Sequence, residues 1–214
     1  MGKLDKVFLR IAGRPVVAYC WYALDQSPEI DQIVLVIRPE LEDRFRAVAR
    51  LYEFSKPFVL TPGGPERQDS VWNGLQTLPP ETELVLIHDA ARPCLTQELI
   101  HKTLTAAQEA GAAVAATPVV DTIKEADPSG QWIARHLDRS RLWAVQTPQT
   151  FRYAVIRKAL ETVRTKGLIL TDDTAACEHI GQPVRLVEWP HPNPKLTHPQ
   201  DIEIIARILR KIYP

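Results

Sequence analysis

The chain has 214 residues, of which 45% are hydrophobic and 24% charged, as is typical of a globular domain with a substantial core. Lys plus Arg and Asp plus Glu number 26 each, so the sequence predicts no large charged surface for nucleic acid or for an anionic membrane. No apolar run approaches the length of a membrane span, and three widely separated cysteines indicate a reducing, cytoplasmic environment rather than disulfides or zinc.

Strands and helices alternate along the first half of the chain. The expected strands cover residues 32–37, 57–60, 84–87 and 112–117, and the expected helices cover about 16–24, 41–52, 68–78 and 97–110. The strand at 84–87 is four aliphatic residues without polar alternation, which predicts burial on both faces. This alternation predicts an α/β fold with a mainly parallel, Rossmann-like sheet flanked by helices, in a single domain spanning 1–214.

The alternation is interrupted between residues 119 and 137. Two extended stretches, 119–126 and 131–137, flank the turn-forming sequence Asp-Pro-Ser-Gly at 127–130 and predict a projecting β-hairpin arm. Ile123, Trp132 and Ile133 on this arm need burial, and a second subunit is the expected place for it. Beyond the arm, strands are expected at 142–145 and 184–187, with helices at 152–165, 171–181 and from 199 onward.

Asp89 is the first candidate for chemistry because it follows the strand at 84–87. Ligands of open α/β sheets gather outside the carboxyl ends of the strands, and a carboxylate there suits Mg²⁺. Ala90 and Ala91 leave room beside it for a ligand. An Asp that only caps the following turn would show the same local pattern.

Further polar residues stand where other elements begin or end. Gly63 and Gly64 precede a helix that contains Ser70, and exposed amides there suit an anionic or base-bearing ligand, although a simple capped loop has the same sequence. Lys195 follows a proline and is held more rigidly than an ordinary surface lysine. Thr171, Asp172 and Asp173 resemble a plain helix N-terminus. One acid, several cations and a Gly-Gly loop together suit transfer at phosphorus better than hydride or acyl transfer.

These blocks, in this order and over essentially the whole chain, resemble the family of 2-C-methyl-D-erythritol 4-phosphate cytidylyltransferases of the non-mevalonate isoprenoid pathway. The matching blocks are residues 6–9 with 13–16, 63–64 with 66–71, 88–93, 121–124, 138–139 with 142–143, 147–149, 171–172 and 195–197. The resemblance implies a nucleotidyltransferase sheet and a reaction between CTP and methylerythritol phosphate that gives the cytidine diphosphate alcohol and pyrophosphate.

The resemblance also implies roles for individual residues. Asp89 would hold Mg²⁺ and the substrate, and Lys6 would stabilise charge that develops at phosphorus. The residues implied to bind CTP are Gly63, Gly64, Ser70 and Ala90, and those implied to bind methylerythritol phosphate are Arg92, Thr122, Arg139, Thr147 and Lys195. Thr122 and Arg139 would come from the arm of a neighbouring subunit, which implies a homodimer joined through residues 119–137.

One part of the family pattern has no counterpart in this sequence. The family begins with a buried strand that runs into a Gly-rich phosphate loop, and Met1-Gly2 align with the end of that loop, so about twenty residues of the pattern are absent. Because the lost strand is central, its neighbours are expected to have unpaired backbone groups. Two alternatives stay open: a ribitol-5-phosphate cytidylyltransferase, which residues 121–124 and 138–139 disfavour, and a non-catalytic truncated paralogue that acts through the arm.

Overall fold

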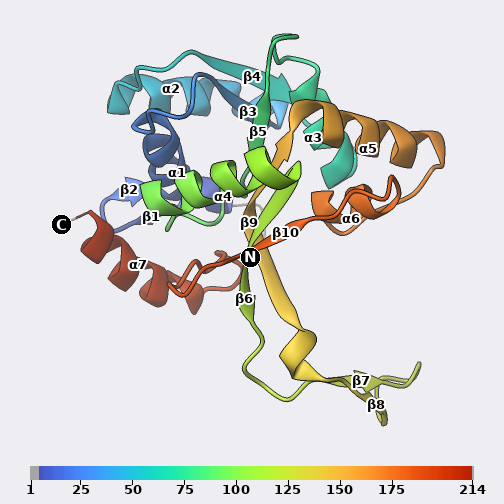
Figure 1. The fold of residues 1–214 in the computed structure, drawn as a ribbon. Helices are drawn as coiled ribbons and strands as arrows, with labels where there is room; N and C mark the ends of the chain where they lie inside the picture. Colours follow the sequence, from blue (N-terminus) through green and yellow to red (C-terminus); the bar gives the residue numbers. More distant parts are fainter. Residues whose placement is uncertain (1–4, 214) are drawn as a thin grey trace.

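The computed structural model describes residues 5–213 and shows an α/β body from which one hairpin projects (Figure 1). The α-helices are α1 (Val16–Asp25), α2 (Glu42–Tyr52), α3 (Arg67–Leu75), α4 (Gln97–Ala110), α5 (Tyr153–Thr165), α6 (Asp173–Glu178) and α7 (Asp201–Ile212). The strands are β1 (Arg10–Ile11), β2 (Arg14–Pro15), β3 (Ile33–Ile37), β4 (Phe58–Pro62), β5 (Leu84–Ile87), β6 (Ala112–Pro118), β7 (Lys124–Ala126), β8 (Ile133–His136), β9 (Trp143–Arg152) and β10 (Arg185–Glu188). Short 3₁₀ turns are η1 (Lys6–Phe8), η2 (Pro39–Leu41) and η3 (Arg139–Arg141).

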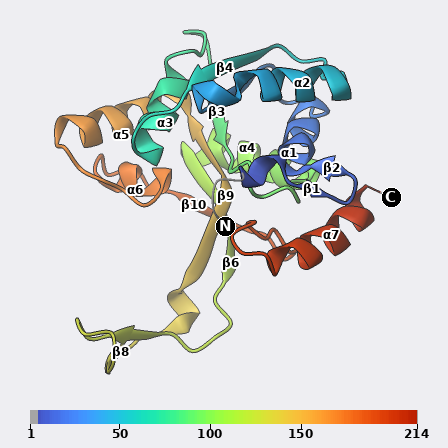
Figure 2. The same ribbon diagram turned by 180° about the vertical axis from the view of Figure 1, so that it is seen from behind.

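The body contains two groups of paired strands. One is a four-stranded sheet in the order β10-β6-β9-β5, in which β10 and β6 are parallel and β9 is antiparallel to both of its neighbours. The other is the parallel pair β3 and β4. The view from behind shows helices packed around these strands, with α5 and α6 on one side of the body and α1, α2 and α7 on the other (Figure 2). The predicted α/β fold with flanking helices is confirmed.

Most predicted elements are present, and the main difference is β9. The sequence predicts a short strand at 142–145, whereas β9 continues through Arg152 and pairs with both β5 and β6. Thr147, Gln149 and Thr150 are polar yet buried, so hydrophobic periodicity does not identify this part of the strand. The predicted cap of α4 is confirmed, because the Thr96 hydroxyl oxygen accepts from the N–H of Leu99.

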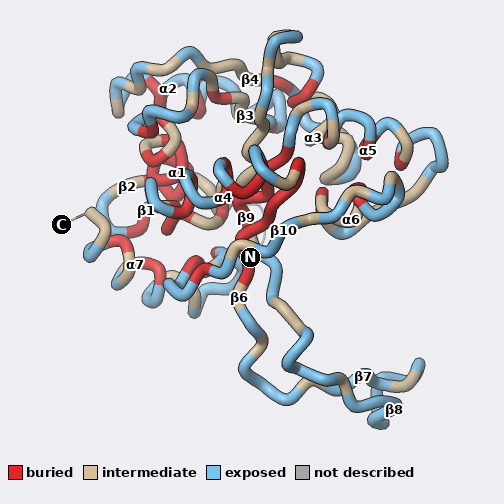
Figure 3. Tube along the Cα trace, viewed as in Figure 1, coloured by how far each residue is buried: buried red, intermediate tan, exposed pale blue. Residues whose placement is uncertain are grey.

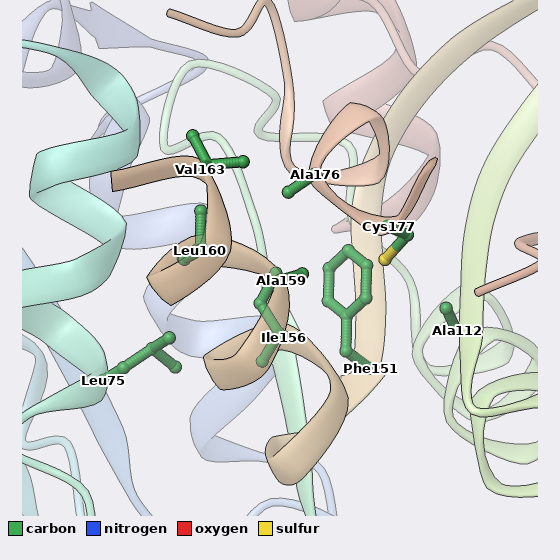
Figure 4. Close-up of a cluster of buried hydrophobic side chains, with 9 residues drawn as sticks. All are labelled: Leu75, Ala112, Phe151, Ile156, Ala159, Leu160, Val163, Ala176 and Cys177. Carbon is green, nitrogen blue, oxygen red and sulfur yellow. The ribbon is translucent and has the colours of Figure 1, made fainter. Parts of the chain in front are cut away.

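The core consists of several apolar clusters between the helices and the strands. In one of them Phe151 of β9 lies among Ile156 and Leu160 of α5 and Cys177 of α6 (Figure 4). All three cysteines are buried and unpaired, and burial raises the pKa of each thiol. Buried residues are concentrated in the body, whereas the hairpin is almost entirely exposed (Figure 3).

The predicted hairpin arm is confirmed as a projecting element. β7 and β8 pair in antiparallel fashion, and the Asp127 carboxylate accepts from the backbone N–H of Gln131 and of Trp132 within the turn. Trp132 is 73% exposed and Ile133 is 70% exposed, which is unusual for large apolar side chains.

The prediction that β5 is buried on both faces is wrong. Each of its four residues is only partly buried, and Val36 of β3 is 37% exposed. The reason is a cavity of about 880 Å³ between β3 and β5, which we call the slot. Within residues 5–213 no strand pairs with the edge of β3 or of β5 that borders the slot.

Candidate active site

Asp89 lies directly after β5, and three cationic side chains surround its carboxylate. The Nζ of Lys195 is 2.6 Å from Oδ2, while the Nε of Arg67 is 3.9 Å from Oδ1 and the Nε of Arg92 is 3.9 Å from Oδ2. The turn after β5 is closed by the backbone, because the N–H of Arg92 donates to the carbonyl of Asp89 at 2.8 Å. The Asp89 carboxylate therefore does not cap this turn and remains available for chemistry.

The charge state of Asp89 follows from this arrangement. Burial raises the pKa of its carboxyl, but the hydrogen bond and charge of Lys195, together with the charge of Arg67, outweigh burial and hold that pKa below its ordinary value. The group is therefore an anion at neutral pH. The cationic side chains around Asp89 can move from its carboxylate to another anion, such as a phosphate, when that anion enters the site.

The backbone at Asp89 is held by the part of β9 that contains the cis peptide bond between Thr147 and Pro148. The Asp89 N–H donates to the Thr147 hydroxyl oxygen at 3.1 Å. The His88 Nε2 lies 3.0 Å from the Arg92 carbonyl, which can only accept, so Nε2 carries the proton. The Nδ1 of His88 then accepts from the Thr147 hydroxyl at 3.1 Å. This arrangement requires a neutral imidazole, and burial lowers the pKa of His88 to about 4.

A buried amide holds the substrate-binding residues predicted from β9 and from the segment before α7. The Nδ2 of Asn193 donates to the Thr147 carbonyl at 2.9 Å, and the carbonyl of Asn193 accepts from the guanidinium of Arg92 at 2.6 Å. Arg92, Thr147 and Lys195 are thereby brought together with Asp89. The Nε of Arg92 is buried and makes no hydrogen bond within the part of the chain that the structure describes.

The Gly63-Gly64 loop lies at the start of α3. The Gly63 N–H donates to the carbonyl of Ile37 at 2.8 Å, and the Gly64 N–H donates to the Ser70 hydroxyl at 3.0 Å. A Cβ atom on Gly64 would lie 2.4 Å from the Cβ of Asp69, so no larger residue fits without a shift of the helix start. Ser70 and Asp89 line the same slot, and Ala90, the fourth residue predicted to bind CTP, lines it too.

Asp173 belongs to the site, although sequence reasoning interpreted it as an ordinary acid at a helix start. Its carboxylate is 1% exposed and lies 2.6 Å from the guanidinium of Arg67, which also reaches Asp89. The Asp173 N–H donates to the Oε1 of Gln149 on β9 at 3.1 Å. The predicted helix N-terminus at residues 171–173 is present, and Asp172 caps α6 by accepting from the N–H of Ala175. No local pattern could identify the Arg67–Asp173 pair, because 106 residues separate its members.

Three predicted residues lie apart from this cluster. Thr122 and Arg139 belong to the arm and its base, and the Arg139 guanidinium donates to the carbonyl of Val120. Lys6 lies in η1, which is preceded by Asp5 in an ion pair with Arg38 at the end of β3. Within one chain, therefore, the arm residues do not approach Asp89, and any contact of theirs with this site requires a second subunit.

In this site a divalent cation would be held by Asp89 together with the substrate. Among residues 5–213 no three His, Cys, Asp or Glu side chains cluster in a way that could hold a metal ion. Mg²⁺ is commonly held by one or two carboxylates together with substrate phosphates, and a single partly exposed carboxylate among three cationic side chains suits that mode.

An α/β sheet with a carboxylate among cations at a strand end is the framework of a nucleotidyltransferase, and the comparisons with known proteins agree. Residues 1–211 match the sequence model of the family described as IspD: 2-C-methyl-D-erythritol 4-phosphate cytidylyltransferase. The chain belongs to this family.

Individual relatives are similar over nearly the whole chain. The 2-C-methyl-D-erythritol 4-phosphate cytidylyltransferase of Geobacillus kaustophilus (strain HTA426) is 41% identical over 206 residues, which are 96% of this chain and 89% of that protein. The 4-diphosphocytidyl-2C-methyl-D-erythritol synthase of Anaerococcus prevotii DSM 20548 superposes with a TM-score of 0.88 at 29% identity, covering 95% of this chain and 93% of that one. The cytidylyltransferase of Thermus thermophilus gives a TM-score of 0.76 at 34% identity, with coverages of 96% and 93%.

Family membership confirms the reaction expected from the sequence, in which CTP and 2-C-methyl-D-erythritol 4-phosphate give 4-diphosphocytidyl-2-C-methyl-D-erythritol and pyrophosphate. The comparisons do not favour a ribitol-5-phosphate enzyme or a non-catalytic paralogue. Among the described residues, no helix is both long enough and apolar enough to span a membrane.

Proposed function

We propose that the cluster around Asp89 carries out cytidylyl transfer in this chain. An oxygen of the methylerythritol phosphate group attacks the α-phosphorus of CTP in line, and the bond from that phosphorus to the bridging oxygen breaks to release pyrophosphate. The observation that carries the proposal is the carboxylate of Asp89, held as an anion among Lys195, Arg67 and Arg92 at the end of β5. Such a cluster supplies the positioning and charge neutralisation on which this chemistry depends.

Arg92, Thr147 and Lys195 bind the phosphate of methylerythritol phosphate. Among the three cations around Asp89, which are Lys195, Arg67 and Arg92, Lys195 has the most exposed side chain, and it reaches Asp89 with one terminal atom. When the substrate phosphate arrives, Lys195 moves from Asp89 to that phosphate, and the released Asp89 carboxylate would be the residue that holds Mg²⁺. The magnesium ion, when bound, neutralises charge on the triphosphate of CTP.

Gly63, Gly64, Ser70 and Ala90 form the binding surface for CTP. The two glycines precede α3, and the partial positive charge at the start of this helix favours an anionic nucleotide. Lys6 stabilises negative charge that develops at the α-phosphorus.

The chain acts as a homodimer in the cytoplasm and has no nucleic-acid or membrane partner. The exposed apolar residues of the arm support a second copy as the partner, since Val120, Trp132 and Ile133 are 81%, 73% and 70% exposed in the single chain. In the dimer the arm carries Thr122 and Arg139 to the neighbouring subunit's substrate.

Pyrophosphate release tests the proposal. Purified protein is assayed with CTP, methylerythritol phosphate and Mg²⁺, with ribitol 5-phosphate as a parallel substrate. Asp89→Asn keeps the size of the side chain and removes its charge, and we expect turnover to fall at least about 100-fold. Asp43→Asn on the exposed first turn of α2 is the matched control and is expected to retain full activity. Undiminished turnover by Asp89→Asn would contradict the assignment, and faster turnover of ribitol 5-phosphate would contradict the substrate.

A further inference from the structure

The three cations around Asp89 do not contact its carboxylate equally. Lys195 makes a direct hydrogen bond, with its Nζ 2.6 Å from Oδ2. The Nε atoms of Arg67 and Arg92 each lie 3.9 Å from a carboxylate oxygen, beyond the distance of about 2.9 Å that is typical of an N–H···O bond. Both arginines therefore neutralise the carboxylate from a distance, and among these three side chains only the lysine bonds to it.

A second acceptor holds each arginine in this position. The Nη1 of Arg67 lies 2.6 Å from the Oδ2 of Asp173, and the Nη1 of Arg92 donates to the backbone carbonyl of Asn193 at 2.6 Å. The guanidinium group is planar and rigid, so a bond at Nη1 limits how closely Nε can approach a second oxygen. Asp173 is the acceptor that can be tested by substitution, because the acceptor for Arg92 belongs to the backbone.

Asp173 binds Arg67 firmly because its carboxylate is buried and its backbone is fixed. The side chain is 1% exposed, and the Asp173 N–H donates to the Oε1 of Gln149 at 3.1 Å. A buried carboxylate without a partner is very unfavourable, so Arg67 cannot leave Asp173 to pair with Asp89. Asp89 is 19% exposed and already bonded to Lys195, so it does not need a second direct partner.

The start of α3 is also fixed where Arg67 extends from it. The Nε2 of Gln68 donates to the carbonyl of Leu168 at 2.7 Å, and its Oε1 accepts from the N–H of Leu170 at 2.9 Å. Two consecutive residues of α3, Arg67 and Gln68, therefore bind the segment that leads into α6. The position of the guanidinium between Asp173 and Asp89 is thus set by contacts on both sides of it.

We propose that Asp173 is a positioning residue for cytidylyl transfer, which keeps Arg67 from pairing directly with Asp89 and so leaves that carboxylate open to Mg²⁺. The inference rests on the proposed function of Asp89. An arginine and a carboxylate in direct contact form two parallel hydrogen bonds, one of the strongest pairings between side chains. Such a pair would occupy the Asp89 oxygens that would hold the metal ion. Lys195 makes a single contact there and is more easily displaced.

A crystal structure of the Asp173→Asn variant tests the geometry. Asn keeps the size of the side chain and removes its charge, which leaves Asp89 as the anion beside Arg67. We expect Arg67 to turn to Asp89, so that the shortest distance between guanidinium and carboxylate falls to about 2.9 Å. The wild-type protein, solved in parallel, should keep the pair of Arg67 and Asp173. An Arg67 side chain that stays in place in the variant would overturn the inference.

The Mg²⁺ concentration that gives half-maximal turnover, measured with both substrates saturating, tests the consequence. We expect it to rise at least about five-fold in Asp173→Asn, because Arg67 then competes for the Asp89 carboxylate. The double variant Arg67→Gln with Asp173→Asn removes both the competitor and the buried charge. Its half-saturating Mg²⁺ concentration should return to the wild-type value or below it. Glu178→Gln, an exposed change on α6, is the control and should match wild type.

Rescue by the second change separates a positioning role from a purely structural one. If loss of the ion pair only loosened the fold, the double variant would need at least as much Mg²⁺ as Asp173→Asn, and that result would overturn the inference. An unchanged Mg²⁺ requirement in Asp173→Asn would overturn it as well. Where Asp173→Asn does not fold, the double variant decides, because a Mg²⁺ requirement above wild type would show that Arg67 does not compete with the metal.

The crystallographic readout also distinguishes failure of this inference from failure of the proposed function. The shift of Arg67 in Asp173→Asn does not depend on turnover. If Asp89→Asn retains full activity, the proposed function fails, whereas the position of Arg67 in the variant still shows whether Asp173 holds it away from Asp89.

Discussion

The charged residues of the site form a connected chain from Lys195 through Asp89 and Arg67 to Asp173. Asp89 and Lys195 are recognisable from the sequence, because each stands beside residues that end a strand or start a helix. The inner members are not, since the contact between Arg67 and Asp173 joins two helix starts that are distant along the chain. A local sequence pattern indicates where a helix or strand begins, but it does not indicate which side chain of another element contacts that position.

Replacement of Asp173 by Asn should destabilise the protein. The guanidinium of Arg67 would lose its buried anionic partner, and we expect the free energy of unfolding to fall by about 1–3 kcal/mol. Urea denaturation measures this difference. Glu178→Gln, an exposed change on the same helix, is the control and should leave stability unchanged. An unchanged midpoint for Asp173→Asn would mean that the ion pair does not stabilise the fold.

His88 should make stability depend on pH in the mildly acidic range. Because burial lowers its pKa from 6.5 to about 4, the unfolded chain binds more protons than the folded chain between these values. Stability should therefore fall as the pH drops from 7 to 5, by up to about 2 kcal/mol from this group. His88→Gln should show a flatter dependence in urea denaturation, whereas exposed His179→Gln should keep the wild-type slope. Identical slopes for all three proteins would contradict a neutral, buried His88.

At the scale of elements, the strands and helices that repeat a regular pattern are predictable and the irregular ones are not. α4 follows from its Thr96 cap and the Gly111 that ends it, and the arm follows from its turn residues. β9 is the counterexample, because the polar residues Thr147 and Gln149 are buried there by hydrogen bonds to distant partners. Because hydrogen bonds to residues of the site hold this part of β9, it lacks the alternation of apolar and polar residues from which a strand is predicted.

The arm offers a direct test of assembly. If a second subunit covers the exposed apolar residues of the arm, the double change Trp132→Ser and Ile133→Ser should raise the dimer dissociation constant at least about ten-fold, because two large side chains buried in the dimer are lost. Sedimentation velocity across a range of concentrations measures this constant. Ile169→Ser removes an equally exposed apolar residue away from the arm and serves as the control. A monomeric wild-type protein at all concentrations would contradict the proposed homodimer.

At the scale of the whole molecule, the order of strands, helices and motifs predicts both the α/β class and the family. Burial of β5 on both faces is predicted incorrectly, because an apolar run shows that a strand could be buried but does not show which elements pack beside it. The cysteines show a similar limit. All three are buried and unpaired, and burial alone would keep them unpaired, so they carry little information about the surrounding compartment.

The reactivity of these buried thiols can also be used to measure local opening of the protein. Cys177 lies in the cluster around Phe151, Cys94 lies in the cluster with Leu196, and Cys20 lines the slot. A thiol reagent can modify each one only after its surroundings part, and burial holds the pKa of Cys94 and Cys177 at about 12. Mass spectrometry of a labelling time course should therefore find Cys20 modified first, with all three far slower than in denaturant. Equal rates for the three would mean that the body opens as one cooperative unit, and unequal rates would rank the stability of its parts.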